Sequence, residues 1–237
     1  MEVHSGWRNI RFGIGRIEAE AIPRHQHLDA YATLVVSGSY EQVSYAGRFR
    51  VQAGDILIQP TLDFHSDSML SSRALIVRLP WDRDASFGGV YRGVPSDLVR
   101  HIADRDPLEA ANVLKQQLHG MRSVPALEGD WSDKLAADLR AAPNLRIVRW
   151  ANANGLTRES IWRCFSRDFG VSPAQFRSEL NARNAWLALT GSREPLSKIA
   201  TEFGFSDQAH MTRAVKSLTG VPPARWRAVL GAARRDN

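Results

Sequence analysis

The stretch over residues 203–227, FGFSDQAHMTRAVKSLTGVPPARWR, decides how the last third of this chain folds. Gly204 predicts a tight turn, and Ser206 is a residue type that caps the start of a helix. Apolar residues then recur every three or four positions up to Gly220, where we expect the helix to end. Because another apolar stripe precedes the turn over 195–202, the sequence predicts two helices joined by a tight turn.

The helix expected over 206–217 has one apolar and one polar face. Met211, Ala214, Val215 and Leu218 form the apolar face, and the polar face holds Gln208, Ala209, Thr212, Arg213 and Lys216. In the major groove of DNA, Gln can bind adenine and Arg can bind guanine through paired hydrogen bonds, and a Thr methyl can contact thymine. We therefore expect Gln208, Thr212 and Arg213 to contact bases. The alternative for the arginine is a phosphate contact, which positions a protein without specifying sequence.

The same plan occurs 50 residues earlier in the chain, because Gly-Val-Ser-Pro at 170–173 matches Gly-Val-Pro-Pro at 220–223. Asn154-Gly155 predicts the turn, and Thr157 can cap the helix that follows. The inward face of that helix is expected to hold Ile161, Cys164, Phe165 and Asp168, and its outward face Glu159, Trp162, Arg163 and Ser166. Two such units, at about 145–168 and 195–217, predict a tandem helix-turn-helix domain.

The outward residues of the first unit allow two interpretations each. Trp162 and Arg163 can contact DNA, since an exposed Trp is costly without a partner. Trp162 can instead pack on the next helix, and Arg163 can hold a phosphate. Glu159 can bind cytosine or discourage the wrong sequences.

Charge and spacing support a helical, DNA-binding C-terminal half. Residues 1–129 carry 14 Lys and Arg against 15 Asp and Glu, a net charge of −1, whereas residues 130–237 carry 17 against 10, a net of +7. Such an asymmetry favours a polyanionic partner, although a solvated basic face would give the same count. We expect helices near 132–141, 145–153, 157–168, 173–189, 195–202, 206–217 and 222–231.

The motif Gly-Phe-Ser-Asp-Gln at 204–208, with Gly-Val-Pro-Pro at 220–223 and Trp226-Arg227, resembles the signature of AraC/XylS-type transcription regulators. The resemblance covers about residues 130–230. It implies two helix-turn-helix units joined by a long helix. The second helix of each unit, called the reader helix below, would enter the major groove, and the two groove segments would lie roughly 34 Å apart. By position, it assigns base contacts to Glu159, Trp162, Arg163, Gln208, Thr212 and Arg213, with Lys216 also on the DNA-binding face. The chain departs from the usual pattern at Ala209, Met211 and Val215.

The first part of the chain predicts short strands separated by turns, which is typical of a sandwich or small barrel. The most distinct runs are Ala32–Val36, Tyr40–Tyr45, Arg48–Gln52, Ile56–Ile58 and Ala74–Val77. The polar segment 82–95 is expected to be a connection. The fold class is thus α+β and multidomain, with domains at 1–94, 95–129 and 130–237.

His25, His27 and His65, together with Gly54 and Pro60, resemble the two sequence motifs of a cupin barrel, a common sensory domain in AraC-type regulators. In metal-binding cupins a glutamate occupies the position of Tyr31. The resemblance leaves three alternatives: a three-histidine site for Zn, Ni or Fe, a pocket for an organic effector lined by these four residues, or ordinary strand histidines.

Helices are expected within 95–129, where Pro107 can start the second of a pair. The apolar stripe Leu108, Ala111, Leu114 and Leu118 suits dimerisation, which this region commonly mediates in the family. The alternative is that the stripe packs on its own barrel.

Other features set the cellular context. The single cysteine, Cys164, fits a reducing compartment and is expected in the core. Residues Met1 to Gly6 show no secretory signal, and no apolar run is long enough for a membrane span. We expect a soluble, cytoplasmic protein without a membrane partner.

Three functions fit the sequence. The first is a ligand-responsive transcription regulator, an activator or a repressor, without enzymatic activity, that binds double-stranded DNA as a homodimer and contacts RNA polymerase. The second is a cupin metalloenzyme with an appended helical module, which the missing glutamate disfavours. The third is a DNA-binding protein whose barrel only dimerises.

Overall fold

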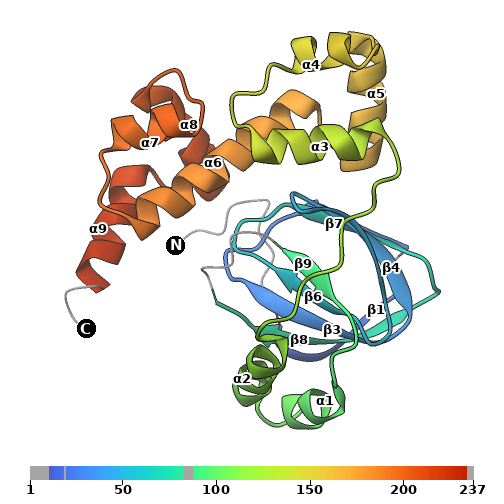
Figure 1. The fold of residues 1–237 in the computed structure, drawn as a ribbon. Helices are drawn as coiled ribbons and strands as arrows, with labels where there is room; N and C mark the ends of the chain where they lie inside the picture. Colours follow the sequence, from blue (N-terminus) through green and yellow to red (C-terminus); the bar gives the residue numbers. More distant parts are fainter. Residues whose placement is uncertain (1–10, 19, 83–87, 234–237) are drawn as a thin grey trace. The chain divides into compact units, whose positions relative to one another are not determined.

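The computed structural model describes residues 11–18, 20–82 and 88–233 (Figure 1). The chain divides into two compact units, one containing residues 5–133 and the other residues 134–237. The first is built on antiparallel sheets and the second is helical, which confirms the predicted fold class. Residues 1–6, where no secretory signal is expected, lie outside the described residues.

The strands of the N-terminal unit pair into two antiparallel sheets. One sheet has the order β1-β8-β3-β6-β9 and the other the order β2-β7-β4-β5. The strands are β1 (Gly13–Ile17), β2 (Ala21–His25), β3 (Tyr31–Ser37), β4 (Ser39–Ser44), β5 (Gly47–Gln52), β6 (Ile56–Gln59), β7 (His65–Met69), β8 (Ala74–Pro80) and β9 (Gly89–Tyr91). The cupin-like barrel is therefore a two-sheet sandwich in the described part of the chain.

Segment 82–95 is not only a connection. Residues Gly89–Tyr91 form β9, which pairs with β6 in the register Ile58↔Gly89 to Ile56↔Tyr91. Strand β9 is three residues long, and its central Val90 is buried in the core. A run of three residues is too short to show the alternation of apolar and polar residues that predicts a strand. The expectation of a connection throughout 82–95 was wrong at this point.

Alternation along the strands gives the five-stranded sheet two apolar faces. Its inner face contributes Val35 and Ile76 to a core that also contains Tyr40 and Phe49 of the other sheet. Its outer face carries Leu34 and Leu79, which pack against helices α1 (Asp97–Ala103) and α2 (Pro107–Leu118). Figure 1 shows both helices beside this sheet.

The apolar stripe of α2 packs on its own barrel. Ala111 and Leu114 are 0% exposed and Leu118 is 9% exposed, all within the core under the sheet. Leu108 alone of the four faces solvent, at 62% exposure. The stripe is therefore not an available dimer surface, and the expectation of dimerisation through it was wrong. Two apolar sheet faces need two covering layers, and the helices supply the second.

A substitution pair tests this packing. Leu114→Ala should lower the free energy of unfolding of the N-terminal unit by about 2–5 kcal/mol, because a fully buried side chain leaves a cavity. Leu108→Ala on the same helix should change it by less than about 0.5 kcal/mol. Urea titration of both variants measures this. Equal losses would show that the stripe is not oriented as described.

Backbone and side-chain bonds hold the segment after α2 on the barrel. The Val124 N–H donates to the Val90 carbonyl at 2.7 Å, and the Leu127 N–H donates to the Arg48 carbonyl at 2.8 Å. The Arg48 guanidinium donates twice to Asp133, with Nε to Oδ1 at 2.7 Å. The barrel, helices α1 and α2 and this segment therefore form one unit, whereas we expected a separate region at 95–129.

All seven helices expected in the C-terminal half are present. They are α3 (Trp131–Ala141), α4 (Ile147–Ala153), α5 (Arg158–Phe169), α6 (Pro173–Gly191), α7 (Leu196–Glu202), α8 (Gln208–Thr219) and α9 (Pro223–Ala233). The Gly residues predicted to end α5 and α8 do so, because Gly170 and Gly220 adopt left-handed backbone angles, φ 72° and 73°.

Helix α6 connects a group made by α3, α4 and α5 with a group made by α7, α8 and α9 (Figure 1). In the first group, Phe165 stacks on Phe169 at 4.5 Å between ring centroids and meets Phe176 of α6 edge-on at 5.4 Å. In the second, Trp186 of α6 meets Trp226 edge-on at 5.5 Å. One helix thus contributes aromatic anchors to both helix-turn-helix units.

The two groups also touch at a turn. Gly204 has φ +75°, and a Cβ placed there would lie 2.5 Å from Asn144 Oδ1 and 3.1 Å from the Pro143 carbonyl oxygen. The same carbonyl accepts a hydrogen bond from Asn181 Nδ2 of α6 at 3.1 Å. The turn of the second unit therefore requires glycine both for its backbone and for this close approach.

Candidate functional site

Helix α5 presents its predicted polar face to solvent. Glu159, Trp162 and Arg163 are exposed, Trp162 at 54%. On the opposite side, Ile161 is 2% and Phe165 0% exposed, while Cys164 is half-buried. Burial of that stripe fixes the rotation of the helix, so the structure turns the three candidate residues outward.

Helix α8 repeats this orientation. Gln208, Arg213 and Lys216 are exposed and Thr212 is half-buried. Met211 and Val215 are both 0% exposed. Each helix-turn-helix unit therefore offers one polar helix face, and neither Arg163 nor Arg213 is buried.

The caps of the two reader helices differ. Thr157 Oγ1 accepts from the Ser160 N–H at 3.1 Å, as predicted. In the second unit the cap is Asp207, whose Oδ1 accepts from the His210 N–H at 2.6 Å, and not Ser206. This hydrogen bond to the His210 N–H, with Ser206 and Arg213 nearby, lowers the pKa of Asp207 below its ordinary value. Both residue types cap helices well, so the sequence could not choose between neighbours.

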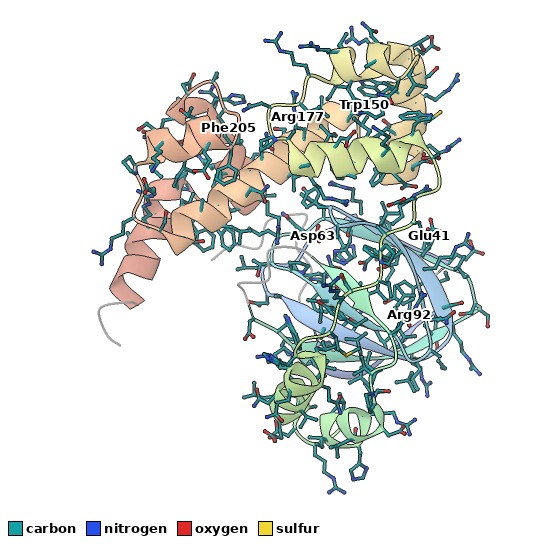
Figure 2. All side chains as sticks on the ribbon, in the orientation of Figure 1. Glu41, Asp63, Arg92, Trp150, Arg177 and Phe205 are labelled. Carbon is teal, nitrogen blue, oxygen red and sulfur yellow. The ribbon has the colours of Figure 1, made fainter. Side chains whose placement is uncertain are left out.

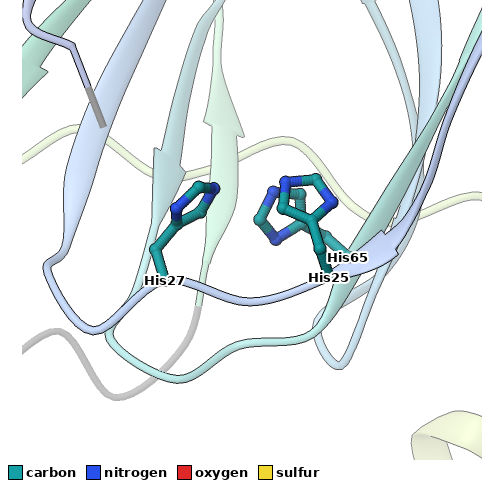
Figure 3. A group of neighbouring side chains, drawn as sticks. All are labelled: His25, His27 and His65. Atoms are coloured by element: carbon teal, nitrogen blue, oxygen red, sulfur yellow. The ribbon is translucent and has the colours of Figure 1, made fainter. Parts of the chain in front are cut away.

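The barrel brings its three motif histidines together (Figure 3). Their ring centroids lie 4.3 Å apart for His25 and His65, 4.9 Å for His25 and His27, and 5.4 Å for His27 and His65. All three are buried, and one ligand atom from each lies within 4.8 Å of the others. Pairing of β2 with β7, in the register His25↔His65, is what joins the two motifs.

Neighbouring groups fix two of these rings. His25 Nδ1 lies 2.8 Å from the Pro23 carbonyl oxygen, and His65 Nδ1 lies 3.0 Å from that of Asp63. Since a carbonyl only accepts, each Nδ1 carries the proton and each Nε2 keeps its lone pair. The Tyr31 hydroxyl lies 3.2 Å from His65 Nε2 and donates to it.

Burial determines the protonation of this cluster. Burial lowers the pKa of His65 well below 6.5, and the neighbouring His25 lowers it further. Burial also raises the pKa of Tyr31, which keeps its proton. Asp67, buried beside Gln42, has its pKa raised to about 6 by burial. Burial therefore favours a neutral His65 and a protonated Tyr31 at neutral pH.

Three buried imidazoles, two of which donate their Nδ1–H to backbone carbonyls, suit a transition metal ion. His25, His27 and His65 would supply its ligands, and the ion would supply a positive charge and open coordination positions. Tyr31 stands where a carboxylate ligand would be expected, and its hydrogen bond uses the lone pair of His65. The residues thus fit a metal, provided that this bond opens.

Residues 150–228 match the protein family described as "Helix-turn-helix domain". The arabinose operon regulatory protein of Salmonella typhimurium is 31% identical over 129 residues, which cover 51% of this chain and 46% of that protein. Its Escherichia coli counterpart is 28% identical over 92 residues, covering 39% of this chain and 32% of that protein. The C-terminal region therefore contains a helix-turn-helix domain. The chain spans less than half the length of these curated relatives.

Among solved structures, ToxT from Vibrio cholerae covers 90% of this chain at 11% identity and a TM-score of 0.41, with 97% of its own length matched. The match to the helix-turn-helix family runs from Trp150 in α4 to Ala228 in α9. Helices α5 and α8 therefore both lie inside the matched helix-turn-helix domain. In the described part of the chain, no helix is long and apolar enough to cross a membrane.

The sequence did not identify every polar group near the sites. In the C-terminal unit, Arg146, Arg158 and Arg177 line one groove at α5. In the barrel, Asp67 and Gln42 form a buried pair, with Gln42 Nε2 donating to Asp67 Oδ1 at 3.1 Å. Arg146 precedes α4, Arg158 is in α5 and Arg177 is in α6, while Asp67 and Gln42 come from two strands, so only packing brings them together.

The histidine cluster gives the N-terminal unit a pH-dependent stability. Because the pKa of His65 is lower in the folded than in the unfolded state, stability is full above about pH 6.5 and falls as pH decreases below it. Between pH 7.5 and 5.5 we expect His65 to contribute a loss of about 1 kcal/mol.

Urea titrations of the parent protein and of His65→Gln at the two pH values measure this difference. The raised pKa of Asp67 acts in the opposite direction, since it favours the folded state as pH decreases below about 6. That contribution is common to both proteins and cancels in the comparison. An identical pH response of the two proteins would show that His65 does not titrate abnormally.

Proposed function

We propose that this protein is a sequence-specific DNA-binding transcription regulator, without enzymatic activity, whose barrel binds a small-molecule effector. The observation that supports it most is the matched pair of polar helix faces in one helix-turn-helix domain. Each face carries an exposed arginine, Arg163 in α5 and Arg213 in α8. A polar helix face with guanidinium and amide groups suits the major groove.

The proposed DNA contacts are shared between the two units. Base contacts are assigned to Glu159, Trp162, Arg163, Gln208, Thr212 and Arg213, and a phosphate contact to Lys216. Helix α6 packs against both helix-turn-helix units and so links α5 with α8. We propose that they enter successive major-groove segments on one face of the duplex.

The proposed effector site is the buried cluster of His25, His27, Tyr31 and His65. A divalent ion such as Zn²⁺, Ni²⁺ or Fe²⁺ is one class of effector that the three imidazoles fit. An organic effector would instead hydrogen-bond to the same nitrogens and to the Tyr31 hydroxyl. In either case, the effector must bind two arrangements of the chain with different affinity in order to regulate.

The histidine cluster also supports a second candidate, a cupin metalloenzyme. Metal-binding cupins carry a glutamate at the position of Tyr31, and the Tyr31 hydroxyl here hydrogen-bonds to His65 Nε2, one of the three nitrogens that a metal would need. The regulator is therefore the better supported function. Homodimerisation and contact with RNA polymerase stay predictions of the family resemblance.

Selection of bound duplexes from a random DNA pool, using the full chain, tests the proposed function. Arg213→Ala should then weaken binding to the selected site by about 1–3 kcal/mol and relax the preference at one base pair. The matched control is Arg193→Ala, since Arg193 is exposed but precedes α7 and is on neither reader helix. Enrichment of no sequence would contradict sequence-specific binding, and an equal loss on all sequences would reassign Arg213 to a phosphate.

A further inference from the structure

A groove of about 510 Å³ runs beside the first reader helix. It lies between α4, α5 and the start of α6, and its lining comes from all three helices. Its apolar lining consists of Ile147, Val148, Ala151, Ile161, Trp162, Pro173 and Ala174. The groove is contained within the C-terminal unit. Figure 2 shows the side chains of this region, with Arg177 labelled.

The groove has a buried apolar floor and an exposed apolar rim. Ile161 and Ala151, at 2% and 3% exposure, form part of the floor. Val148 and Trp162 on the rim are 62% and 54% exposed. Only a few other large apolar side chains in the described residues are as exposed, and an apolar patch of this kind marks an interaction site.

Three arginines line the same groove, and none of the residues that line it is acidic. Arg146 precedes α4, Arg158 begins α5 and Arg177 is in α6. A hydrogen bond holds the Arg177 guanidinium in place, since its Nη1 donates to the Leu145 carbonyl oxygen at 2.7 Å. An occupant should therefore be apolar where it enters the groove and anionic where it meets the rim.

Three kinds of anion could meet these arginines. DNA phosphates would find no hydrogen-bond donor on the apolar floor, and burying them there would remove their hydration without compensation. A small amphipathic anion would leave the exposed rim largely uncovered, whereas ligand pockets normally enclose most of their ligand. A protein segment can fill the floor and cover the rim, and Trp with Arg is the combination enriched at the centres of protein interfaces.

We propose that this groove docks an acidic segment of a second protein. Large apolar side chains of that segment enter between Val148 and Trp162, while its carboxylates pair with Arg146, Arg158 and Arg177. This is the mode in which an amphipathic helix lays its apolar face into a groove. The partner would lie beside the first reader helix and would compete with DNA for Trp162.

Two synthetic peptides test the proposal on the full chain. Both are amphipathic helices of about 20 residues with a leucine stripe, one with glutamate and the other with lysine at the polar positions. Fluorescence anisotropy of labelled peptide should show the glutamate peptide binding at least about tenfold more tightly than the lysine peptide. Equal affinity of the two, or no binding of the glutamate peptide up to about 1 mM, would overturn the proposal.

Substitutions locate the binding surface. Val148→Asp should weaken the glutamate peptide at least about tenfold, whereas Leu108→Asp should leave it unchanged. Leu108 is the matched control because it is equally exposed, at 62%, but belongs to the N-terminal unit. Arg146→Glu with Arg158→Glu should shift the preference toward the lysine peptide. If this pair leaves both peptides unaffected and instead reduces the salt dependence of DNA binding, the arginines belong to the DNA interface and the proposal is wrong.

Discussion

Phe165→Ala is expected to lower the free energy of unfolding of the C-terminal unit by about 3–5 kcal/mol. The ring is 0% exposed, stacks on Phe169 and meets Phe176 of α6 edge-on. Its loss would leave a cavity where the reader helix joins the connecting helix and would remove two aromatic contacts. Urea unfolding followed by far-ultraviolet circular dichroism measures the change.

The control for this variant lies on the same helix. Trp162→Ala removes a larger side chain from the exposed face, so it should leave stability within about 0.5 kcal/mol of the parent while weakening DNA binding. The two variants thus separate the folding face of α5 from its proposed reading face. If Trp162→Ala were the more destabilising, the rotation of α5 described above would be wrong.

Replacing both reader arginines, with Arg163→Ala and Arg213→Ala combined, should weaken binding to the selected site by about 2–6 kcal/mol. Each single change is expected to cost about 1–3 kcal/mol, and the residues are on different helices, so the losses should add. Fluorescence anisotropy at fixed salt concentration measures the affinity, since phosphate contacts make binding salt-dependent.

The control is a double variant that removes the same amount of positive charge outside the reader helices. Arg193→Ala combined with Arg225→Ala removes two exposed arginines that are on neither reader helix. This pair should cost far less than the reader pair and should leave the base preference intact. Equal losses in the two double variants would mean that overall charge, and not the reader faces, determines binding.

The helices of the C-terminal unit could be predicted because their boundaries are encoded locally. Thr157 caps α5 by accepting a hydrogen bond from the nearby Ser160 N–H. Gly170 and Gly220 end α5 and α8 in the left-handed backbone conformation, which other residues rarely adopt. The apolar spacing then fixed which face of each helix is buried, and so which way Arg163 and Arg213 point. None of these signals depends on distant parts of the chain.

The barrel was less predictable because its contacts are not local. Strand β7 contains the run His65 to Met69, with polar residues on both faces, so it carries no apolar alternation. The apolar stripe of α2 has the spacing of a helix, and this predicted the helix. That the stripe packs on the outer face of the sheet follows only from the structure. The sequence motifs named His25, His27 and His65, while their closeness depends on the register between β2 and β7.

The spacing between the two DNA segments that α5 and α8 contact tests the central claim most directly. Methylation interference at guanine N7 on the selected duplex should give two major-groove patches on one face, centred about one helical turn, or 10 bp, apart. Inserting about 5 bp between the patches should abolish the second and reduce the affinity to that of one unit. A single patch, or an affinity that the insertion leaves unchanged, would contradict tandem reading by α5 and α8.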